Sequence, residues 1–433
     1  MLFFMLSSNT MRTFIDFFTL SDPNIRYVVL GTMLLTSSAA IVGTFALLKK
    51  KALLGDATAH AVFPGICIAF MCTGTKHPIY LAIGAFATGW LALLLIDMLT
   101  KYSKIKEDIA IALLLSITFG IGTLLLSIIQ NSANVAQVGL NNYLFGKAAA
   151  LLGEDLILLS ILGLIILITI GSFFKEFTLI AFDKAFAQSL GLPVSLLEFI
   201  FTSLIVLAIV IGIRAVGIVL MAAMLITPAA AARFWTDRLL TMVGLAALFG
   251  LLSGLLGSFI SYIIPGMPTG PWIVLVVTTI AYVSFLFAPH KGIVARRLRQ
   301  QRHQQKILQE NILKLFYELG EKNDDSFGFR SIQDLIYHRP ISIDKLIKGI
   351  KFLENGGFLY HKGDKWRLTG AGKNEGQRIT QQHRLWELYL SKYLQIEPIY
   401  THENAELIEH VLTPELVKEL SKLLENNNDQ RTK

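Results

Sequence analysis

Two residues with metal-binding side chains, Asp56 and His60, stand four residues apart in an almost wholly apolar stretch. A spacing of four places both side chains on one face of a helix. Pro64 falls on that face too, and because proline has no N–H, the carbonyl group of His60 would lack its helical partner. A carboxylate, an imidazole and a free carbonyl suit Mn²⁺, Fe²⁺ or Zn²⁺. Asp56 taken alone could instead cap the helix near the lipid headgroups.

The elements that must position this pair are membrane helices. Of the 433 residues, 53% are hydrophobic and 16% are charged, but the charged residues concentrate after His290. Before that point, apolar runs approach the ~20 residues that cross a bilayer. We therefore predict an all-α membrane domain of eight or nine helices and then a soluble tail. The expected spans are 26–48, 52–72, 78–99, 108–130, 154–174, 194–213, 216–233, 239–263 and 270–288.

Lysines and arginines predict the orientation of these spans. Cations cluster after the first, third, fifth, seventh and ninth spans, and the other connections carry few. By the positive-inside rule the cation-rich side is cytoplasmic, so the tail is expected in the cytoplasm and the chain in the cell (inner) membrane. Residues 1–25 are expected to form an amphipathic lead-in helix. Cys67 and Cys72 lie in one apolar segment and imply no disulfide framework.

Three ordered motifs resemble the permeases of metal-ion ABC transporters, the family that imports manganese, zinc and iron. They are LLGDATAHAVFPGI (53–66), FDKAFAQSLGLP (182–193) and RAVGIVLMAAMLITPAAAARFW (214–235). The resemblance implies that residues 26–290 form the permease domain and that Asp56 and His60 line the metal path. It also implies three partners: an ABC ATPase subunit, an extracytoplasmic metal-binding protein and a second permease copy.

The second motif is a short amphipathic piece on the predicted cytoplasmic side. In the family this segment is the coupling helix that docks on the ATPase, which assigns ATPase coupling to Asp183, Gln188 and Gly191. A plain interfacial helix would have the same composition. The chain has no G-x-x-x-x-G-K-[ST] phosphate loop, because the glycines of LTGAGKN (368–374) have the wrong spacing. We therefore expect a transport subunit that is not an enzyme, with ATP hydrolysed by a separate polypeptide.

The tail begins with a basic helical linker, residues 291–308, and continues with a helix, turn, helix and two short strands over residues 309–375. This order predicts a winged helix whose recognition helix is 342–354. Lys345, Lys348 and Lys351 lie along that helix and could contact DNA phosphates. Winged helices also bind proteins, so both kinds of partner remain open.

Residues 376–433 carry histidines and glutamates at helical spacing, an inventory suited to a divalent cation. HRLWE (383–387) and HENAELIEHVLTPEL (402–416) resemble the metal-binding helices of the diphtheria toxin repressor family. The resemblance assigns metal-binding roles in a metal-binding and dimerisation domain to His383, Glu387, His402, Glu406, Glu409 and His410. Glutamate at 406 favours manganese. Asn311 and Lys314 depart from the family, which places an acidic or thioether ligand in that turn, so we expect either weaker metal binding or metal binding that does not couple to DNA binding.

The leading hypothesis is the permease of an ATP-driven Mn²⁺, Fe²⁺ or Zn²⁺ importer, fused to a metal-sensing cytoplasmic domain. The alternative is a membrane-tethered or cleavable metal-dependent transcription regulator. An ion-coupled secondary transporter fits less well, because the coupling-helix motif would then have no purpose.

Overall fold

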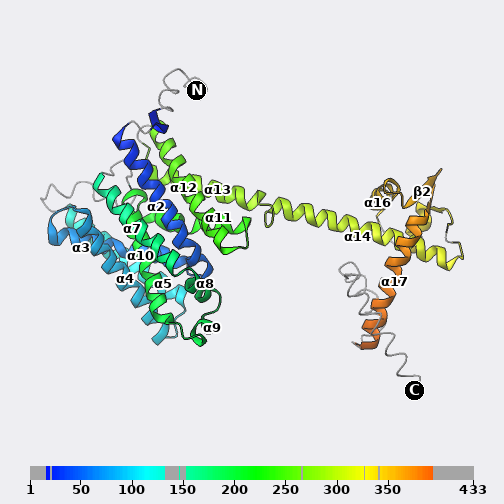
Figure 1. Cartoon of the computed structure of the whole chain (residues 1–433), viewed down its shortest axis with the longest axis horizontal. Helices are drawn as coiled ribbons and strands as arrows, with labels where there is room; N and C mark the ends of the chain where they lie inside the picture. The colour runs from blue at the N-terminus through cyan, green and yellow to red at the C-terminus, as the bar shows by residue number, and fades with distance from the viewer. Residues whose placement is uncertain are drawn as a thin grey trace. The chain divides into compact units, whose positions relative to one another are not determined.

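The computed structural model describes residues 16–19, 22–131, 146, 153–264, 267–325, 327–339 and 342–393. It divides into two compact units, residues Met1–Ala295 and Arg296–Lys433 (Figure 1). Each unit has its own hydrophobic core, and the two are described separately below.

In the described part of the first unit, nine helices are long and apolar enough to cross a membrane. Their positions agree with the predicted spans to within a few residues. Two short helices, α8 (Phe174–Phe182) and α9 (Lys184–Ser189), lie between the fifth and sixth of them. The nine are α2 (Pro23–Leu48), α3 (Ala52–Thr73), α4 (Pro78–Tyr102), α5 (Glu107–Gln130), α7 (Gly153–Ser172), α10 (Val194–Val216), α11 (Ile218–Trp235), α12 (Leu239–Ile263) and α13 (Thr269–Phe287).

Helices α2 and α3 occupy the interior of this unit. In the most apolar stretch of each, 72% of the residues are buried, against 28% in α5, α7, α12 and α13. Helix α2 packs against α7, α10, α11 and α12, while α3 packs against α4, α5, α10 and α11 (Figure 1). The helix that carries Asp56 and His60 is therefore enclosed by other helices of the bundle.

Two glycines are required by the way these helices meet. A Cβ atom on Gly65 of α3 would lie 2.1 Å from the carbonyl oxygen of Gly84 in α4, so only glycine allows the two backbones to approach this closely. Gly217 joins α10 to α11 with φ 90° and ψ 161°, a conformation open essentially to glycine alone. The third sequence motif therefore contains the break between two helices.

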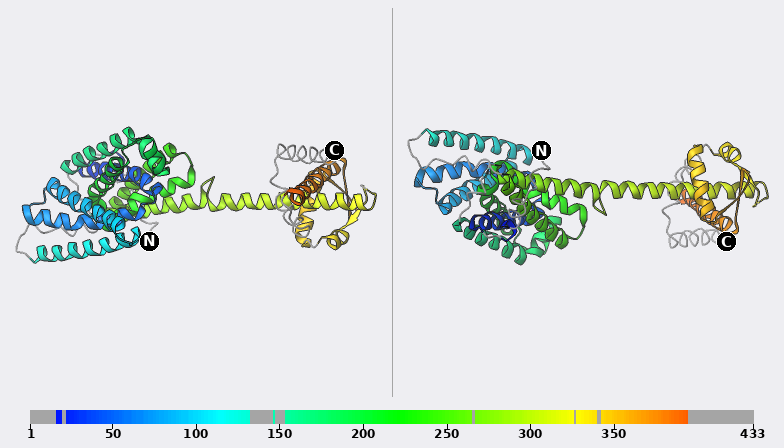
Figure 2. Two further views of the ribbon diagram at one scale, coloured as in Figure 1. Left: turned by 90° about the horizontal axis from the view of Figure 1, so that it is seen from below. Right: turned by 90° about the horizontal axis from the view of Figure 1, so that it is seen from above.

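The second unit combines helices with a small antiparallel sheet. Helix α14 (Ile293–Lys322) leads into β1 (Arg330–Ser331), α15 (Ile332–His338), α16 (Ile343–Asn355), β2 (Leu359–Lys362), β3 (Lys365–Leu368) and α17 (Gly370–Tyr393). The sheet order is β1-β3-β2, with Tyr360 opposite Arg367. Figure 2 shows α16, α17 and the strands gathered around the C-terminal half of α14. Their shared core includes Ile312, Phe316, Leu335, Leu346, Leu368 and Ile379.

Local sequence explains where α15 begins. The Ser331 hydroxyl accepts a hydrogen bond from the Asp334 backbone N–H at 3.2 Å, and the Asp334 carboxylate accepts one from the Ser331 N–H at 2.9 Å. This reciprocal capping box satisfies two backbone donors at the helix start. It fixes the short helix that precedes the predicted recognition helix.

Candidate functional site

The structure places the side chains of Asp56 and His60 together on one face of α3. The His60 Nε2 atom lies 3.7 Å from Asp56 Oδ1, and the two side chains are 13% and 42% exposed, respectively. The His60 Nδ1 atom is buried and has no hydrogen-bond partner among the described residues. The rings of His60 and Phe119 are perpendicular in a T-shaped contact, with ring centroids 5.1 Å apart. Either nitrogen of the neutral imidazole could therefore supply the one lone pair that binds a metal ion.

The separation of the two side chains suits a single shared ion. An ion about 2.1 Å from both His60 Nε2 and Asp56 Oδ1 would make an angle of about 120° between them at the observed 3.7 Å. Two donors do not complete a coordination shell. Across the described residues, no group of three or more His, Cys, Asp or Glu side chains is arranged to hold a metal.

Helix α9 is short, and its start is fixed by one of the predicted coupling residues. Asp183 is its N-cap, and its carboxylate accepts a hydrogen bond from the Phe186 N–H at 2.9 Å. Gln188 is exposed, and Gly191 has φ +77°, which permits the turn that follows. Ala187 is fully buried and anchors the helix to the bundle core.

The outer face of α9 is more apolar than the sequence motif suggested. Phe182, Phe186 and Leu190 are 69%, 51% and 58% exposed. Phe182 ends α8, before the extended residue Asp183, whereas Phe186 and the C-cap residue Leu190 are four residues apart and share a face of α9. Exposed apolar side chains of this kind suit a surface that lipid or another protein covers.

A cleft of about 860 Å³ lies between the turn that joins α2 to α3, α4, the α8–α9 segment and α10. Its charged lining consists of five lysines and two acids. Of these, Glu198 on α10 pairs with both Lys184 and Lys49. The charged residues of the lining are Lys49, Lys50, Lys51, Asp97, Lys101, Lys184 and Glu198.

In the second unit, the three lysines expected to contact DNA are all exposed on α16: Lys345, Lys348 and Lys351. Lys345 and Lys348 also line a cleft of about 660 Å³ between α16 and α14. In the β2–β3 hairpin, Arg367 lies against the rings of Phe329 and Tyr360, 5.1 Å from each centroid. Its guanidinium group is held by cation–π contacts within the unit.

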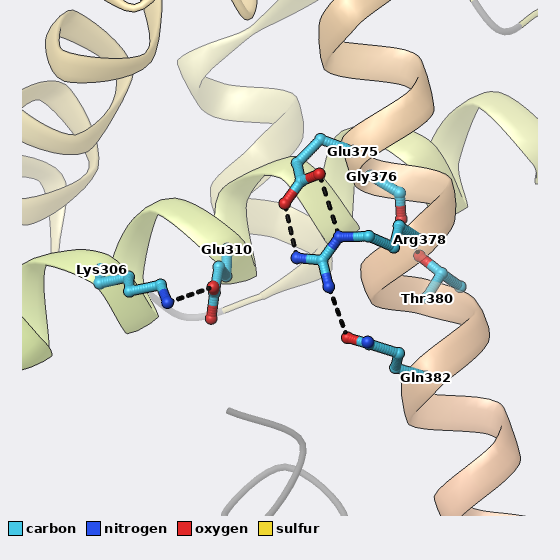
Figure 3. Close-up of polar contacts among 7 residues, drawn as sticks. All are labelled: Lys306, Glu310, Glu375, Gly376, Arg378, Thr380 and Gln382. Carbon is cyan, nitrogen blue, oxygen red and sulfur yellow. Dashed lines mark hydrogen bonds and ion pairs between the residues drawn. The ribbon is translucent and has the colours of Figure 1, made fainter. Parts of the chain in front are cut away.

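Helices α14 and α17 are joined by close packing and by an ion pair. A Cβ atom on Gly376 would lie 3.0 Å from the Leu313 carbonyl oxygen. Eight residues further along each helix, the Arg384 guanidinium donates hydrogen bonds to both carboxylate oxygens of Glu321, with one N–O distance of 3.1 Å. Figure 3 shows further contacts within each helix: Arg378 with Glu375 and Gln382 on α17, and Lys306 with Glu310 on α14.

This α14–α17 contact contains the described part of the expected regulatory metal site. His383 is 2% exposed, and Lys314 is 1% exposed. The Asn311 Oδ1 atom is buried without a hydrogen-bond partner among the described residues, which leaves one oxygen donor available to a cation. Lys314 brings a cationic side chain to the same turn as Asn311, so the described residues fit a resident metal only in part.

The other expected ligands of this site are not placed. Glu387 lies on α17, but its side chain is not described. His402, Glu406, Glu409 and His410 lie outside the described residues. Their roles stay predictions that follow from the sequence.

Comparison with known proteins assigns the first unit to a family. Residues 21–288, more than half of the chain, match the model of the ABC 3 transport family. The chain belongs to the ABC 3 transport family. Residues 369–430 match a second model, the iron dependent repressor, metal binding and dimerisation domain. The resemblance drawn from the motifs is confirmed for both parts of the chain.

Named relatives of this ABC 3 family member include the manganese transport system membrane protein MntC of Bacillus subtilis. It is 38% identical over 386 residues, 89% of this chain and 88% of that protein. The zinc transport system membrane protein TroC of Treponema pallidum is 42% identical over 282 residues, 65% of this chain and 95% of that protein. A solved structure, PsaBC from Streptococcus pneumoniae in complex with Fab, matches with TM-score 0.59 and 30% identity, over 67% of this chain and 99% of that one.

Neither Glu198 nor Lys49 was expected from the sequence to have a functional role. An acidic residue within the predicted 194–213 span was the available signal, because a carboxylate in an apolar helix usually has a partner. That partner could not be read from the pattern. The structure supplies it from the end of α2 and from α9.

Proposed function

We propose that this chain is the membrane permease subunit of an ATP-driven importer of divalent transition-metal ions, with Mn²⁺ favoured and then Fe²⁺ or Zn²⁺. The observation that carries the proposal is the Asp56–His60 pair, 3.7 Å apart on an enclosed membrane helix. A carboxylate and an imidazole suit these ions. Relatives named for manganese and zinc transport support the same class of cargo.

The partners follow from the same role. Helix α9, with the exposed side chains of Phe186 and Leu190 and with Phe182 at the end of α8, would dock on a separate ATPase in the cytoplasm. The lysine-rich turn at residues 49–51 and Lys184 belong to the same cleft, as expected for the cytoplasmic side. A metal-binding protein would deliver the ion on the opposite side, and a second permease copy would complete the path.

The test is metal uptake by the reconstituted complex. Full-length chain, the ATPase and the binding protein are incorporated into proteoliposomes, and radioactive Mn²⁺ uptake is followed with ATP, with a non-hydrolysable ATP analogue, and without the ATPase. Uptake should require both hydrolysable ATP and the ATPase. Transport by the permease alone would contradict the proposal. Competition by unlabelled Fe²⁺ and Zn²⁺ ranks the ions.

We also propose that the second unit is a cytoplasmic metal-sensing domain. Helices α14, α15 and α16 with the β2–β3 hairpin follow the order of a winged helix, with α16 as its recognition helix. The match over residues 369–430 supports a metal-binding and dimerisation part after it. We expect Mn²⁺ or Fe²⁺ to bind more weakly than in the family, because α14 carries Lys314 where the family has an acidic or thioether ligand. The residues that would hold the ion are His383, Glu387, His402, Glu406, Glu409 and His410.

A membrane-tethered or cleavable transcription regulator is the second candidate function. It is favoured by the exposure of Lys345, Lys348 and Lys351 along one helix. DNA affinity measured on full-length chain in nanodiscs should fall steeply with salt, because phosphate contacts dominate. Lys348→Gln should reduce the salt slope by about one ion. The matched variant Lys306→Gln removes a lysine that pairs with Glu310 and should leave the slope unchanged.

A further inference from the structure

One carboxylate joins two lysines that come from different parts of the membrane unit. Glu198 lies near the start of α10. Its Oε2 atom accepts a hydrogen bond from Lys184 Nζ, at the first position of α9, at 2.9 Å. Its Oε1 atom lies 3.9 Å from Nζ of Lys49, the residue that caps α2. Glu198 therefore connects α9 to the end of α2 through α10.

The Lys49 side of this connection is buried. Its side chain is 9% exposed, and its ammonium lies 4.7 Å from the centroid of the Phe201 ring, one turn beyond Glu198. Burial lowers the pKa of Lys49 to about 8, Glu198 opposes this shift, and Lys51 and Lys184 add to it. Glu198 is thus the acid that compensates a largely dehydrated cation.

The turn after Lys49 is short and has a fixed geometry. The Lys50 N–H bonds to the Leu47 carbonyl at 3.1 Å, and the Lys51 N–H bonds to the Ala46 carbonyl at 2.9 Å. Lys50 has φ +58°, so the turn is a Schellman motif with a lysine at the left-handed position. Helix α3 begins at the next residue, Ala52. Because this turn is short and hydrogen-bonded, a movement of Lys49 would also move the start of α3.

Asp56 lies four residues, about one turn, after the start of α3. The chain of contacts runs from α9 through Lys184, Glu198 and Lys49 to the helix that carries the metal pair. A parallel contact exists between α8 and α2, where Phe45 meets Phe174 and Phe177 with centroids 5.7 Å and 6.1 Å apart. Apolar ring contacts tolerate sliding, whereas the ion pairs set a fixed distance.

We propose that Glu198 is a positioning residue that links movement of α9 to the Asp56–His60 pair, so that ATP hydrolysis is coupled to metal release through Lys184 and Lys49. This inference rests on the proposed function. It assigns Glu198 to the link between two sites and not to metal binding. Removing its charge should therefore lower the transport obtained per ATP hydrolysed, while the ATPase and the metal-binding protein still bind.

The test measures Mn²⁺ ions transported per ATP hydrolysed by the complete complex in proteoliposomes. Glu198→Gln should lower this ratio roughly 5- to 150-fold, the range of ordinary coupling free energies, while the ATPase still binds and hydrolyses ATP. Lys184→Gln should lower it in the same direction. Because the Lys184 side chain is 53% exposed, this second variant tests the link with little risk to folding.

Two comparisons separate positioning from a purely structural role. The matched variant Lys101→Gln removes another lysine of the same cleft, one that lies over the ring of its neighbour Tyr102, and should keep the wild-type ratio. Adding Lys184→Gln to Glu198→Gln should cost nothing further, because both act through one link. Thermal unfolding of each variant is followed in parallel.

A wild-type ratio in both Glu198→Gln and Lys184→Gln would overturn the inference. So would a loss of transport in strict proportion to a loss of folded protein, with the ratio unchanged. If the wild-type complex itself fails to couple uptake to ATP, the proposed function fails instead. The two failures are therefore distinguishable.

Discussion

Replacing Asp56 with asparagine tests the metal path with the smallest change in shape. Two unit charges 4 Å apart attract by about 1 kcal/mol in water and about 4 kcal/mol near a protein surface, and a divalent ion doubles both values. The Asp56 side chain is 42% exposed, which places it toward the aqueous limit. We therefore expect a loss of about 2 to 3 kcal/mol of ion stabilisation, roughly 30- to 150-fold in affinity.

The assay is uptake of radioactive Mn²⁺ at limiting concentration by cells that lack other manganese importers. Protein levels in the membrane and recovery of the ATPase with the permease are measured for each variant. His60→Gln should show a loss in the same direction, because it removes the second donor of the pair. Asp108→Asn removes an exposed carboxylate from the first turn of α5 and should transport normally.

Normal uptake by Asp56→Asn at limiting Mn²⁺ would refute the placement of this side chain on the path. An equal defect in Asp108→Asn would show that the loss is not specific to the pair. A defect that disappears at saturating Mn²⁺ would support a binding role, since the carboxylate contributes affinity for the ion.

Three further outcomes are expected. Ala187→Pro should uncouple Mn²⁺ transport from ATP hydrolysis in proteoliposomes, because Ala187 is the buried residue of the short helix α9 and proline would disrupt that helix. An unchanged ratio of Mn²⁺ transported to ATP hydrolysed would contradict this. Lys314→Glu should raise the Mn²⁺ affinity of the chain about tenfold or more in calorimetry on a background without Asp56, since it exchanges a buried cation for a carboxylate; unchanged affinity would argue against a metal site there. Because the pKa of Lys49 is lowered to about 8, its charge and its pairing with Glu198 are present below that pH and lost above it. Uptake should therefore fall as the pH rises above about 8, while Lys49→Arg, which stays charged, should keep its activity; superimposable pH profiles would contradict this account.

The sequence alone predicted the features that depend on local pattern. The lengths of the apolar runs placed the membrane helices, because a span must satisfy its own backbone hydrogen bonds and match the bilayer. The four-residue spacing of Asp56 and His60 placed them on one face, because helix geometry brings such residues together wherever the helix lies. In the tail, the same reasoning located α16 and its exposed lysines.

Only the tertiary structure decided which distant residues meet. The pairing of Glu198 with Lys49 and Lys184 joins α10 to the end of α2 and to α9, and no local periodicity encodes it. The sequence placed Lys314 on a helix but did not predict whether its side chain is buried. Its burial is set by the packing of α14 within its unit. Contacts between distant segments depend on how whole helices pack, so the proposed coupling route required the fold, while the Asp56–His60 pair could be predicted from one helix.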